Sequence, residues 1–238
     1  MAEVVGVMAN RIIWTHLRPN RKARFACLGA AVLVLLGIPL RAEGPRTVVF
    51  FGDSITAGYG LADPAEQAYP ALVAKRIAAA GIPWRVSNAG LSGETTAGGL
   101  RRIDWVLRQP ADLVVLALGG NDGLRGVPPP ETAANLRGII GRIRARRPGA
   151  GIVLAGMLMP DSMGADYARQ FASVFGDVAR EERVGLIPFL LEGVGGRPEL
   201  NQADGIHPNA AGHAAVAETV WRALRPLHSP PAPPAHAP

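Results

Sequence analysis

Three side chains that together can carry out nucleophilic catalysis occur in two short segments far apart in the chain. Ser54 follows Gly52 and Asp53 directly after an apolar run, whereas Asp204 and His207 lie three residues apart near the C-terminus. A serine hydroxyl attacks a carbonyl when a histidine accepts its proton, and that histidine needs a partner that fixes its tautomer. Because a turn brings residues three apart together, the Asp204 carboxylate can bind one ring nitrogen of His207 and leave the other for Ser54.

The same residues also permit simpler interpretations. Asp53 or Ser54 could cap a helix, and Asp204 could cap a turn that carries His207 at the surface. Residues 52–58 match neither of the phosphate-binding patterns GxxxxGK[ST] and GxGxxG. They do not form a GxSxG elbow either, because the residue two positions after Ser54 is a threonine. The remaining histidines lack a comparable acidic neighbour or lie in the C-terminal tail: His16, His213, His228 and His236.

Two glycine-rich loops could stabilise the negative charge that develops on a carbonyl oxygen under attack. One loop covers residues 88–95, and the other covers residues 119–123 with the sequence Gly-Gly-Asn-Asp-Gly. Glycine lets backbone N–H groups approach a substrate closely, and an asparagine amide adds a neutral donor. Ordinary turns use the same residue types, so neither loop identifies a site by itself.

Short apolar runs alternate with longer segments of helical periodicity from residue 47 onwards. The predicted strands are Thr47–Phe51, Trp84–Asn88, Asp112–Leu118, Gly151–Met157 and Gly185–Phe189. The predicted helices are Tyr69–Ala80, Thr96–Arg108, Glu131–Arg146, Tyr167–Arg183 and Asn209–Leu224. Continuous apolar strands are typical of a sheet that helices cover on both faces. We therefore predict a single-domain, three-layer α/β/α sandwich with a doubly wound, mainly parallel five-stranded sheet of the flavodoxin-like type.

The predicted topology brings the candidate residues to one edge of the sheet. In doubly wound sheets, ligands bind beyond the carboxyl ends of the strands. The loops at that edge contain the serine, both glycine-rich segments and the Asp–His pair, and they cover residues 52–60, 89–98, 119–130, 158–165 and 190–208.

The composition fits one medium-sized domain and argues against several classes of protein. The chain has 238 residues, 48% of them apolar, which suffices for a sizeable core. Its single cysteine, Cys27, excludes a disulfide framework and a cysteine-based zinc site. The net charge of +6 would suit a nucleic-acid-binding protein, but residues 1–46 carry seven basic and two acidic residues. The remaining chain carries 18 basic and 17 acidic residues, so we expect no nucleic-acid partner.

Four sequence blocks, taken in order along the chain, resemble the GDSL or SGNH hydrolase family. They are Gly-Asp-Ser after the first strand, Ser-Gly after the second, Gly-Gly-Asn-Asp after the third and Asp-x-x-His before the last helix. The resemblance extends over residues 47–227. The segments FGDSITAGYG, GGNDGLRG and DGIHPN are most similar to the branch of secreted bacterial arylesterases and multifunctional acyl-CoA thioesterase I/lysophospholipases.

The resemblance implies a role for each residue of the four blocks. Ser54 would be the nucleophile, His207 the general base and Asp204 the residue that orients the base. The oxyanion hole would consist of the Ser54 N–H, the Gly93 N–H and the Asn121 side chain. Residues 92–95, Ser-Gly-Glu-Thr, match the Ser-Gly-acid-Thr pattern of this branch. This match favours Gly93 over the competing Gly90. Asp53 and Asp122 are expected to be structural.

The implied activity is two-step acyl transfer from a small-molecule ester or thioester, without a metal or an organic cofactor. An acyl groove along Leu124, Met159 and Pro160 is expected, although these residues could simply cover the sheet edge. A carbohydrate-ester deacetylase of the same family is the main alternative. A nucleotide- or flavin-binding protein and a catalytically silent binding protein fit the blocks less well. We expect a monomer or a weak dimer.

The N-terminal region has the pattern of a targeting segment. A basic stretch, residues 18–24, precedes an apolar run at 26–40, which is shorter than the roughly 20 residues of a membrane span. A signal peptide that is cleaved after Ala42 fits, and an uncleaved anchor or a cytosolic chain are the alternatives. We therefore expect a periplasmic or secreted protein with no stable membrane span after processing. The expected organisation is a signal peptide or anchor, an SGNH hydrolase domain and a disordered Pro/Ala-rich tail, at residues 1–42, 43–227 and 228–238.

Overall fold

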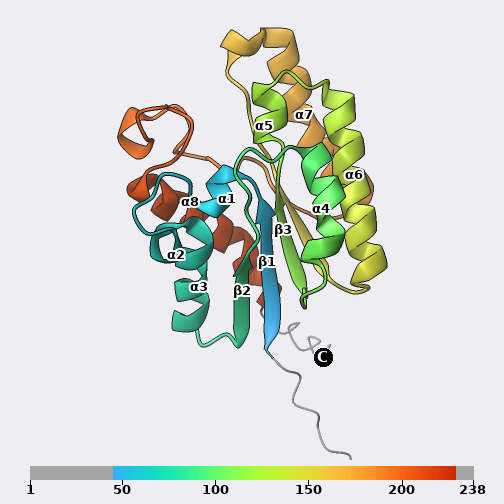
Figure 1. Ribbon diagram of the computed structural model, residues 1–238, viewed down its shortest axis with the longest axis vertical. Helices are drawn as coiled ribbons and strands as arrows, with labels where there is room; N and C mark the ends of the chain where they lie inside the picture. Colours follow the sequence, from blue (N-terminus) through green and yellow to red (C-terminus); the bar gives the residue numbers. More distant parts are fainter. Residues whose placement is uncertain (1–44, 229–238) are drawn as a thin grey trace, which may run out of the picture. The chain divides into compact units, whose positions relative to one another are not determined.

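A five-stranded parallel sheet forms the centre of the protein in a computed structural model, which describes residues 45–228 (Figure 1). The strands are β1 (Arg46–Gly52), β2 (Trp84–Asn88), β3 (Leu113–Ala117), β4 (Gly151–Ala155) and β5 (Gly185–Ile187). Their order in the sheet is β2-β1-β3-β4-β5, and every neighbouring pair is parallel. This confirms the predicted doubly wound, flavodoxin-like sheet.

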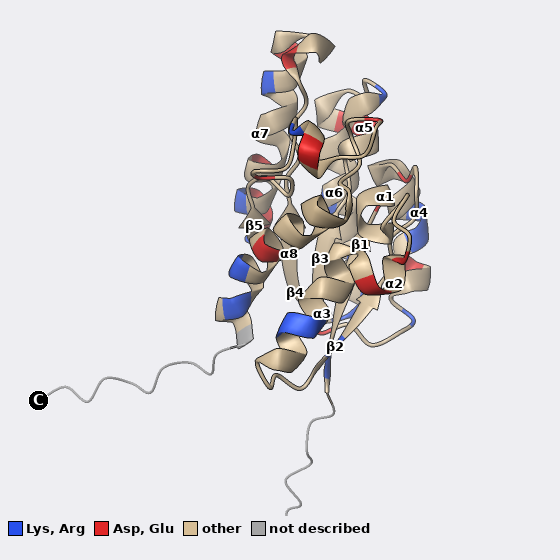
Figure 2. Ribbon diagram, turned by 90° about the vertical axis from the view of Figure 1, so that its left-hand side faces the viewer, with Lys and Arg blue, Asp and Glu red and all other residues tan. Residues whose placement is uncertain are grey.

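Helices on both faces of the sheet complete the three layers (Figure 1). On one face, α3 (Tyr69–Ala79) packs against α8 (Ala210–Leu224), with α3 contacting β2 and α8 contacting β5. On the other face, α6 (Pro129–Arg146) lies between α4 (Thr96–Val106) and α7 (Ala165–Glu182). Basic and acidic side chains are interspersed along these helices, as expected for a nearly neutral domain (Figure 2).

Buried residues of the central strands form the core between the layers. Phe50 and Phe51 are fully buried, and because neighbouring residues of a strand point to opposite faces, each packs into a different layer. Phe50 contacts the ring of Tyr69 from α3 at 5.5 Å, and Phe51 lies beneath α4. Truncating either phenylalanine to alanine would cost about 3–5 kcal/mol. β1 is thereby held firmly at the point where Ser54 follows it.

The remaining elements are short and are concentrated in the loops. They are α1 (Ser54–Ala57), α2 (Pro64–Gln67), α5 (Gly120–Leu124) and the 3-10 helices η2 (Asp161–Met163), η3 (Pro198–Leu200) and η4 (Arg225–His228). The sequence-based assignment lacks α1, α2 and α5, because four or five residues are too few to show helical periodicity. The predicted strand at 185–189 ends at Ile187, since Pro188 has no N–H to donate to the sheet.

Two parts of the predicted organisation lie outside the described residues. These are the signal peptide or anchor at residues 1–42 and the tail beyond His228. His228 itself, the first residue of the predicted tail, ends η4. Among residues 45–228, no helix combines the length and the apolar character needed to cross a bilayer.

Candidate active site

Ser54 lies at the carboxyl end of β1, where it begins the short helix α1. Asp53 caps this helix, and its carboxylate accepts a hydrogen bond from the Ile55 N–H at 3.0 Å. Gly52 leaves no room for a side chain, because a Cβ there would lie 2.1 Å from the Thr56 hydroxyl oxygen. The structure thus confirms that Asp53 caps a helix, and it places Ser54, the predicted nucleophile, directly after this cap.

A continuous hydrogen-bonded chain joins the three residues predicted to perform catalysis. The Ser54 Oγ lies 2.8 Å from His207 Nε2, and His207 Nδ1 lies 2.7 Å from Asp204 Oδ2. The other Asp204 oxygen accepts the backbone N–H groups of Ile206 and His207, both at 3.0 Å. This turn fixes the carboxylate relative to the ring, as the three-residue spacing predicts. The ring in turn faces the serine hydroxyl.

The hydrogen bonds around Asp204 keep its carboxyl group ionised. Burial by itself would raise the pKa of Asp204. Hydrogen bonds from the His207 backbone, the His207 ring and the Ile206 N–H outweigh it and lower the pKa to about 2. The negative charge beside the imidazole is therefore present throughout the neutral and mildly acidic range.

Two residues outside the four sequence blocks support the His207 loop. The centroid of the exposed Tyr59 ring lies 4.8 Å from that of the His207 ring. Gln202 donates side-chain hydrogen bonds to the Tyr59 and Pro208 carbonyl oxygens, at 2.7 and 3.0 Å. Its backbone N–H also binds the His207 carbonyl at 2.8 Å. Sequence reasoning missed the contacts of Tyr59 with His207 and Gln202, because they join segments more than 140 residues apart.

The two candidate glycines of the second block have different environments. The Gly90 N–H donates to the Asn88 side-chain oxygen at 2.9 Å, and a Cβ on Gly90 would lie 2.3 Å from the Ala57 backbone. Gly90 is thus needed for close packing. Gly93 has a φ of +77°, and its N–H has no hydrogen-bond acceptor within residues 45–228. The Gly93 N–H is therefore available to a substrate, whereas that of Gly90 is not.

Asn121 lies in α5, next to the Gly93 loop. One N–H of its amide donates to the Glu94 carbonyl at 3.1 Å, which leaves the second N–H for a ligand. The neighbouring Asp122 is buried and accepts the Thr96 N–H at 2.8 Å as well as the Thr96 hydroxyl. Asp122 therefore fastens α5 to the start of α4, in agreement with its expected structural role.

A buried ion pair holds the Gly93 loop against the sheet. The Glu94 side chain is 3% exposed and pairs with Arg102 of α4, whose Nε lies 2.7 Å from the carboxylate. Arg102 also donates to the Ala89 carbonyl at 2.8 Å, and its guanidinium carbon lies 4.6 Å from the centroid of the Phe51 ring. The pair thus connects the loop at both of its ends to the core. The sequence contains no local signal for it beyond the two charges.

Two further buried groups lie near the hydrogen-bonded chain of Ser54, His207 and Asp204. Burial raises the pKa of Asp53 to about 6, against the opposing effects of the Ile55 hydrogen bond and the His207 charge. Burial, followed by the charge of His207, lowers the pKa of His213 to about 4. His213 Nδ1 accepts the Tyr69 N–H at 3.2 Å, so this histidine fastens α8 to α3 in its neutral form.

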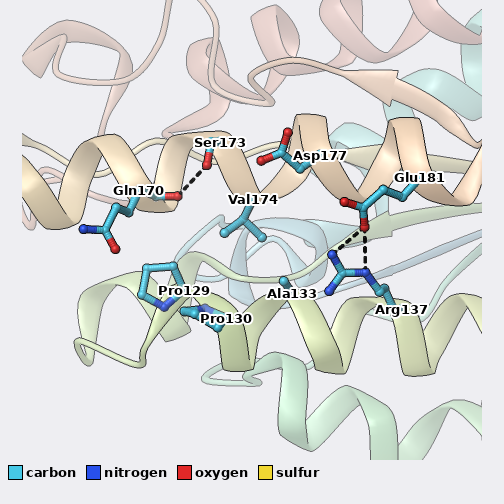
Figure 3. A pocket seen from close by; sticks show the side chains of 9 residues that line it. All are labelled: Pro129, Pro130, Ala133, Arg137, Gln170, Ser173, Val174, Asp177 and Glu181. Atoms are coloured by element: carbon cyan, nitrogen blue, oxygen red, sulfur yellow. Dashed lines mark hydrogen bonds and ion pairs between the residues drawn. The ribbon is translucent and has the colours of Figure 1, made fainter.

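Two of the three residues predicted to line an acyl groove, Leu124 and Met159, lie in or against α5. Met159 packs over Gly123, where a Cβ would be 2.4 Å from its sulfur atom. Leu124 is 45% exposed, and Pro160 is exposed as well. A separate hollow of about 260 Å³ lies between α6 and α7, where Arg137 pairs with Glu181 (Figure 3). None of the predicted site residues lines that hollow.

The fold and the site together define an α/β/α hydrolase with a serine nucleophile candidate at the carboxyl edge of its sheet. Residues 50–215 match the model of the GDSL-like Lipase/Acylhydrolase family. The chain belongs to this family, and it is an ester hydrolase, as the sequence blocks predict.

The chain is similar to several characterised members of the family. It is 44% identical to esterase TesA of Pseudomonas aeruginosa over 84% of this chain and 96% of that protein. It is 36% identical to thioesterase 1/protease 1/lysophospholipase L1 of Escherichia coli, over 82% of this chain and 91% of that protein. The crystal structure of TesA superimposes with a TM-score of 0.72, covering 76% of this chain and 99% of that one.

Proposed function

We propose that the protein cleaves carboxylic esters and thioesters by two-step acyl transfer, with Ser54 as the nucleophile. The observation that carries the proposal is the hydrogen-bonded chain from Ser54 through His207 to Asp204, at 2.8 and 2.7 Å. His207 takes the serine proton as the Oγ attacks the carbonyl carbon, and then donates it to the departing alcohol or thiol. Water, activated by the same imidazole, hydrolyses the acyl-enzyme.

The oxyanion of the tetrahedral intermediate is stabilised by the Ser54 N–H, the Gly93 N–H and the Asn121 amide. The free N–H of Gly93 and the second amide N–H of Asn121 support this assignment. Each donor of this kind contributes about 3–4 kcal/mol to transition-state stabilisation. Asp204 stays ionised, holds the His207 tautomer and stabilises the imidazolium that forms during attack.

The acyl chain of the substrate lies along Leu124, Met159 and Pro160 in this proposal. Leu124 and Pro160 are exposed, which supports this placement. Met159 supports it as well, because it packs over Gly123 of α5, the helix that carries Asn121. A Met159→Ala variant tests the groove through its preference among p-nitrophenyl esters from acetate to decanoate. We expect the optimum to shift to a different chain length. An unchanged chain-length profile would exclude these residues from the acyl site.

Export from the cytoplasm is part of the proposal, because a basic stretch and an apolar run precede the domain. Fractionation of cells that express the full chain tests it. We expect the activity in the periplasmic or extracellular fraction, and an intact N-terminus in the cytoplasmic fraction would contradict it.

Hydrolysis of p-nitrophenyl esters by the purified protein tests the mechanism. Ser54→Ala and His207→Ala should each lower kcat by about 10⁴-fold or more, because catalytic residues of this type act as a unit. A burst of p-nitrophenol equal to the enzyme concentration should precede the steady state if deacylation is slow. Ser173→Ala, at an exposed serine of α7, is the matched control and should keep the parent activity. Full activity of the Ser54 variant would rule the mechanism out.

A further inference from the structure

An open pocket of about 500 Å³ adjoins the Gly93 loop on the side of α4. It shares Gly93 itself with the proposed oxyanion hole, so a group bound there is part of the same substrate or its immediate neighbour. The lining is polar and contains small residues that leave space for a ligand. The complete lining is Leu91, Ser92, Gly93, Glu94, Thr95, Gly98, Arg101, Arg102 and Arg125.

The pocket is strongly basic although the domain around it is nearly neutral. Three arginines and one carboxylate line it, which gives a local charge of +2. Glu94 and Arg102 neutralise each other in the buried pair that holds the loop. The excess charge therefore belongs to Arg101 and Arg125.

Neither of these two arginines has a carboxylate partner within residues 45–228. Arg125 donates to the Gly93 carbonyl at 3.0 Å. This bond occupies one of its five N–H groups, and the neutral carbonyl leaves the positive charge of the guanidinium uncompensated. Arg101 is exposed, and its side chain makes no hydrogen bond or ion pair in the same part of the chain. On this domain most other arginines of the outer helices are paired with acidic residues, for example Arg142 with Asp104.

We infer that Arg101 and Arg125 form a subsite for a phosphate group carried by the substrate. The planar guanidinium presents its N–H groups in a fork that fits phosphate oxygens. Two such groups without acidic partners, in a pocket open to solvent, favour a doubly charged anion over a neutral alcohol. The inference rests on the proposed function, because the phosphate is attached to the ester or thioester that Ser54 attacks.

Arg125 gives this subsite a direct connection to catalysis. It caps the C-terminal end of α5, the helix that follows β3, and donates to the carbonyl of Gly93, whose N–H faces the substrate in the proposed mechanism. A phosphate held by Arg125 therefore fixes the position of the substrate relative to the oxyanion hole. The phosphate of a glycerolipid headgroup and that of a nucleotide thioester would both bind two arginines in this way. The two kinds of substrate differ in the group attached to the phosphate, so they can be tested separately.

Two pairs of matched substrates test the subsite in the full-length protein. Octanoylglycerol and octanoylglycerol phosphate differ only in the phosphate of a lipid headgroup. The octanoyl thioesters of pantetheine and of coenzyme A differ in the phosphate-bearing nucleotide portion. For each pair, the measured quantity is the ratio of kcat/KM for the charged substrate to kcat/KM for the neutral one.

We expect Arg101→Gln and Arg125→Gln each to lower this ratio by about tenfold or more, because each removes a charge-assisted contact. The parent ratio should also fall with rising salt concentration, which screens an exposed charged site. The pair of substrates that shows the larger fall identifies the source of the phosphate. Arg108→Gln removes an exposed arginine just beyond α4 and is the matched control, with an expected ratio equal to that of the parent.

Ratios that stay at the parent value in both arginine variants and in both substrate pairs would overturn the inference. An equal loss on charged and neutral substrates would overturn it as well, because it would mean that the arginines only support the loop. A different result would refute the proposed function itself, namely that the parent protein does not hydrolyse the neutral esters at all.

Discussion

Replacing Asp53 with asparagine is expected to stabilise the folded protein at neutral pH but much less in acid. Burial raises the pKa of Asp53 from its ordinary value of 3.8 to about 6, despite the Ile55 hydrogen bond and the charge of His207. A shift of this size corresponds to about 3 kcal/mol. The folded state binds the proton more tightly than the unfolded chain. In the parent protein, the bound proton on Asp53 therefore stabilises the folded state fully below about pH 4, and this stabilisation is lost as the pH rises through about 6.

The asparagine variant removes this pH dependence while keeping the helix cap, since its side-chain oxygen can still accept the Ile55 N–H. Between about pH 4 and about pH 7.5, the unfolding free energy of the variant relative to the parent should rise by about 2–3 kcal/mol. Urea unfolding followed by circular dichroism at a series of pH values measures this difference. Asp63→Asn removes an exposed carboxylate at the cap of α2 and serves as the matched control.

A free-energy difference between variant and parent that is the same at every pH would refute the reasoning. It would show that Asp53 does not hold its proton more tightly in the folded state. Hydrolytic kcat is measured alongside, because Asp53 immediately precedes Ser54. A variant that is more stable and slower would show that the buried carboxyl group is kept for the reaction at the expense of stability.

Three further changes probe the site. Asp204→Asn should lower kcat by about 10⁴-fold, because the ionised oxygen that fixes the His207 tautomer is lost, and a loss below tenfold in ester hydrolysis would contradict this role. Arg102→Met leaves Glu94 buried without its partner and should cost about 3–5 kcal/mol in urea unfolding. Adding Glu94→Gln should recover most of that cost, and a failure to recover it would argue against the ion pair. The pKa of His213 is lowered to about 4, so the unfolded chain binds its proton more tightly and folding loses stability as the pH falls below about 6.5. In His213→Asn, the loss of unfolding free energy between about pH 7 and about pH 4.5 should be smaller by about 2 kcal/mol, and a pH dependence equal to that of the parent would contradict the assignment.

The candidate catalytic residues, which the structure brings together, could be picked out from the sequence because their signals are local. Asp204 and His207 lie within one turn, and Ser54 follows a strand whose apolar run is evident. The strands β1 and β3 are buried along almost their whole length, so their residue types alone indicate them. Each block follows a predicted strand or precedes the last helix, and a parallel sheet brings the carboxyl ends of all strands to one edge. The order of the blocks therefore predicts that they meet at that edge.

The features that the sequence does not reveal depend on contacts between distant segments. The Glu94–Arg102 pair joins a loop to a helix, and nothing local distinguishes these two charges from solvated ones. Tyr59 approaches His207 only because two loops meet at the sheet edge. The sequence match alone favours Gly93 over Gly90, but the physical difference between them, the hydrogen bond that occupies the Gly90 N–H, is visible only in the structure.

The positions of the two ends of the described domain determine where the enzyme can be fused or immobilised. The first residue of β1, Arg46, and Leu227 of the C-terminal 3-10 helix line the same hollow, together with the first residues of the strands that flank them. Both ends of the described domain thus leave from the amino edge of the sheet, opposite the edge that carries Ser54 (Figure 1). A carrier protein, a resin or a membrane tether joined at either end would leave the opening of the active site facing the surrounding solution.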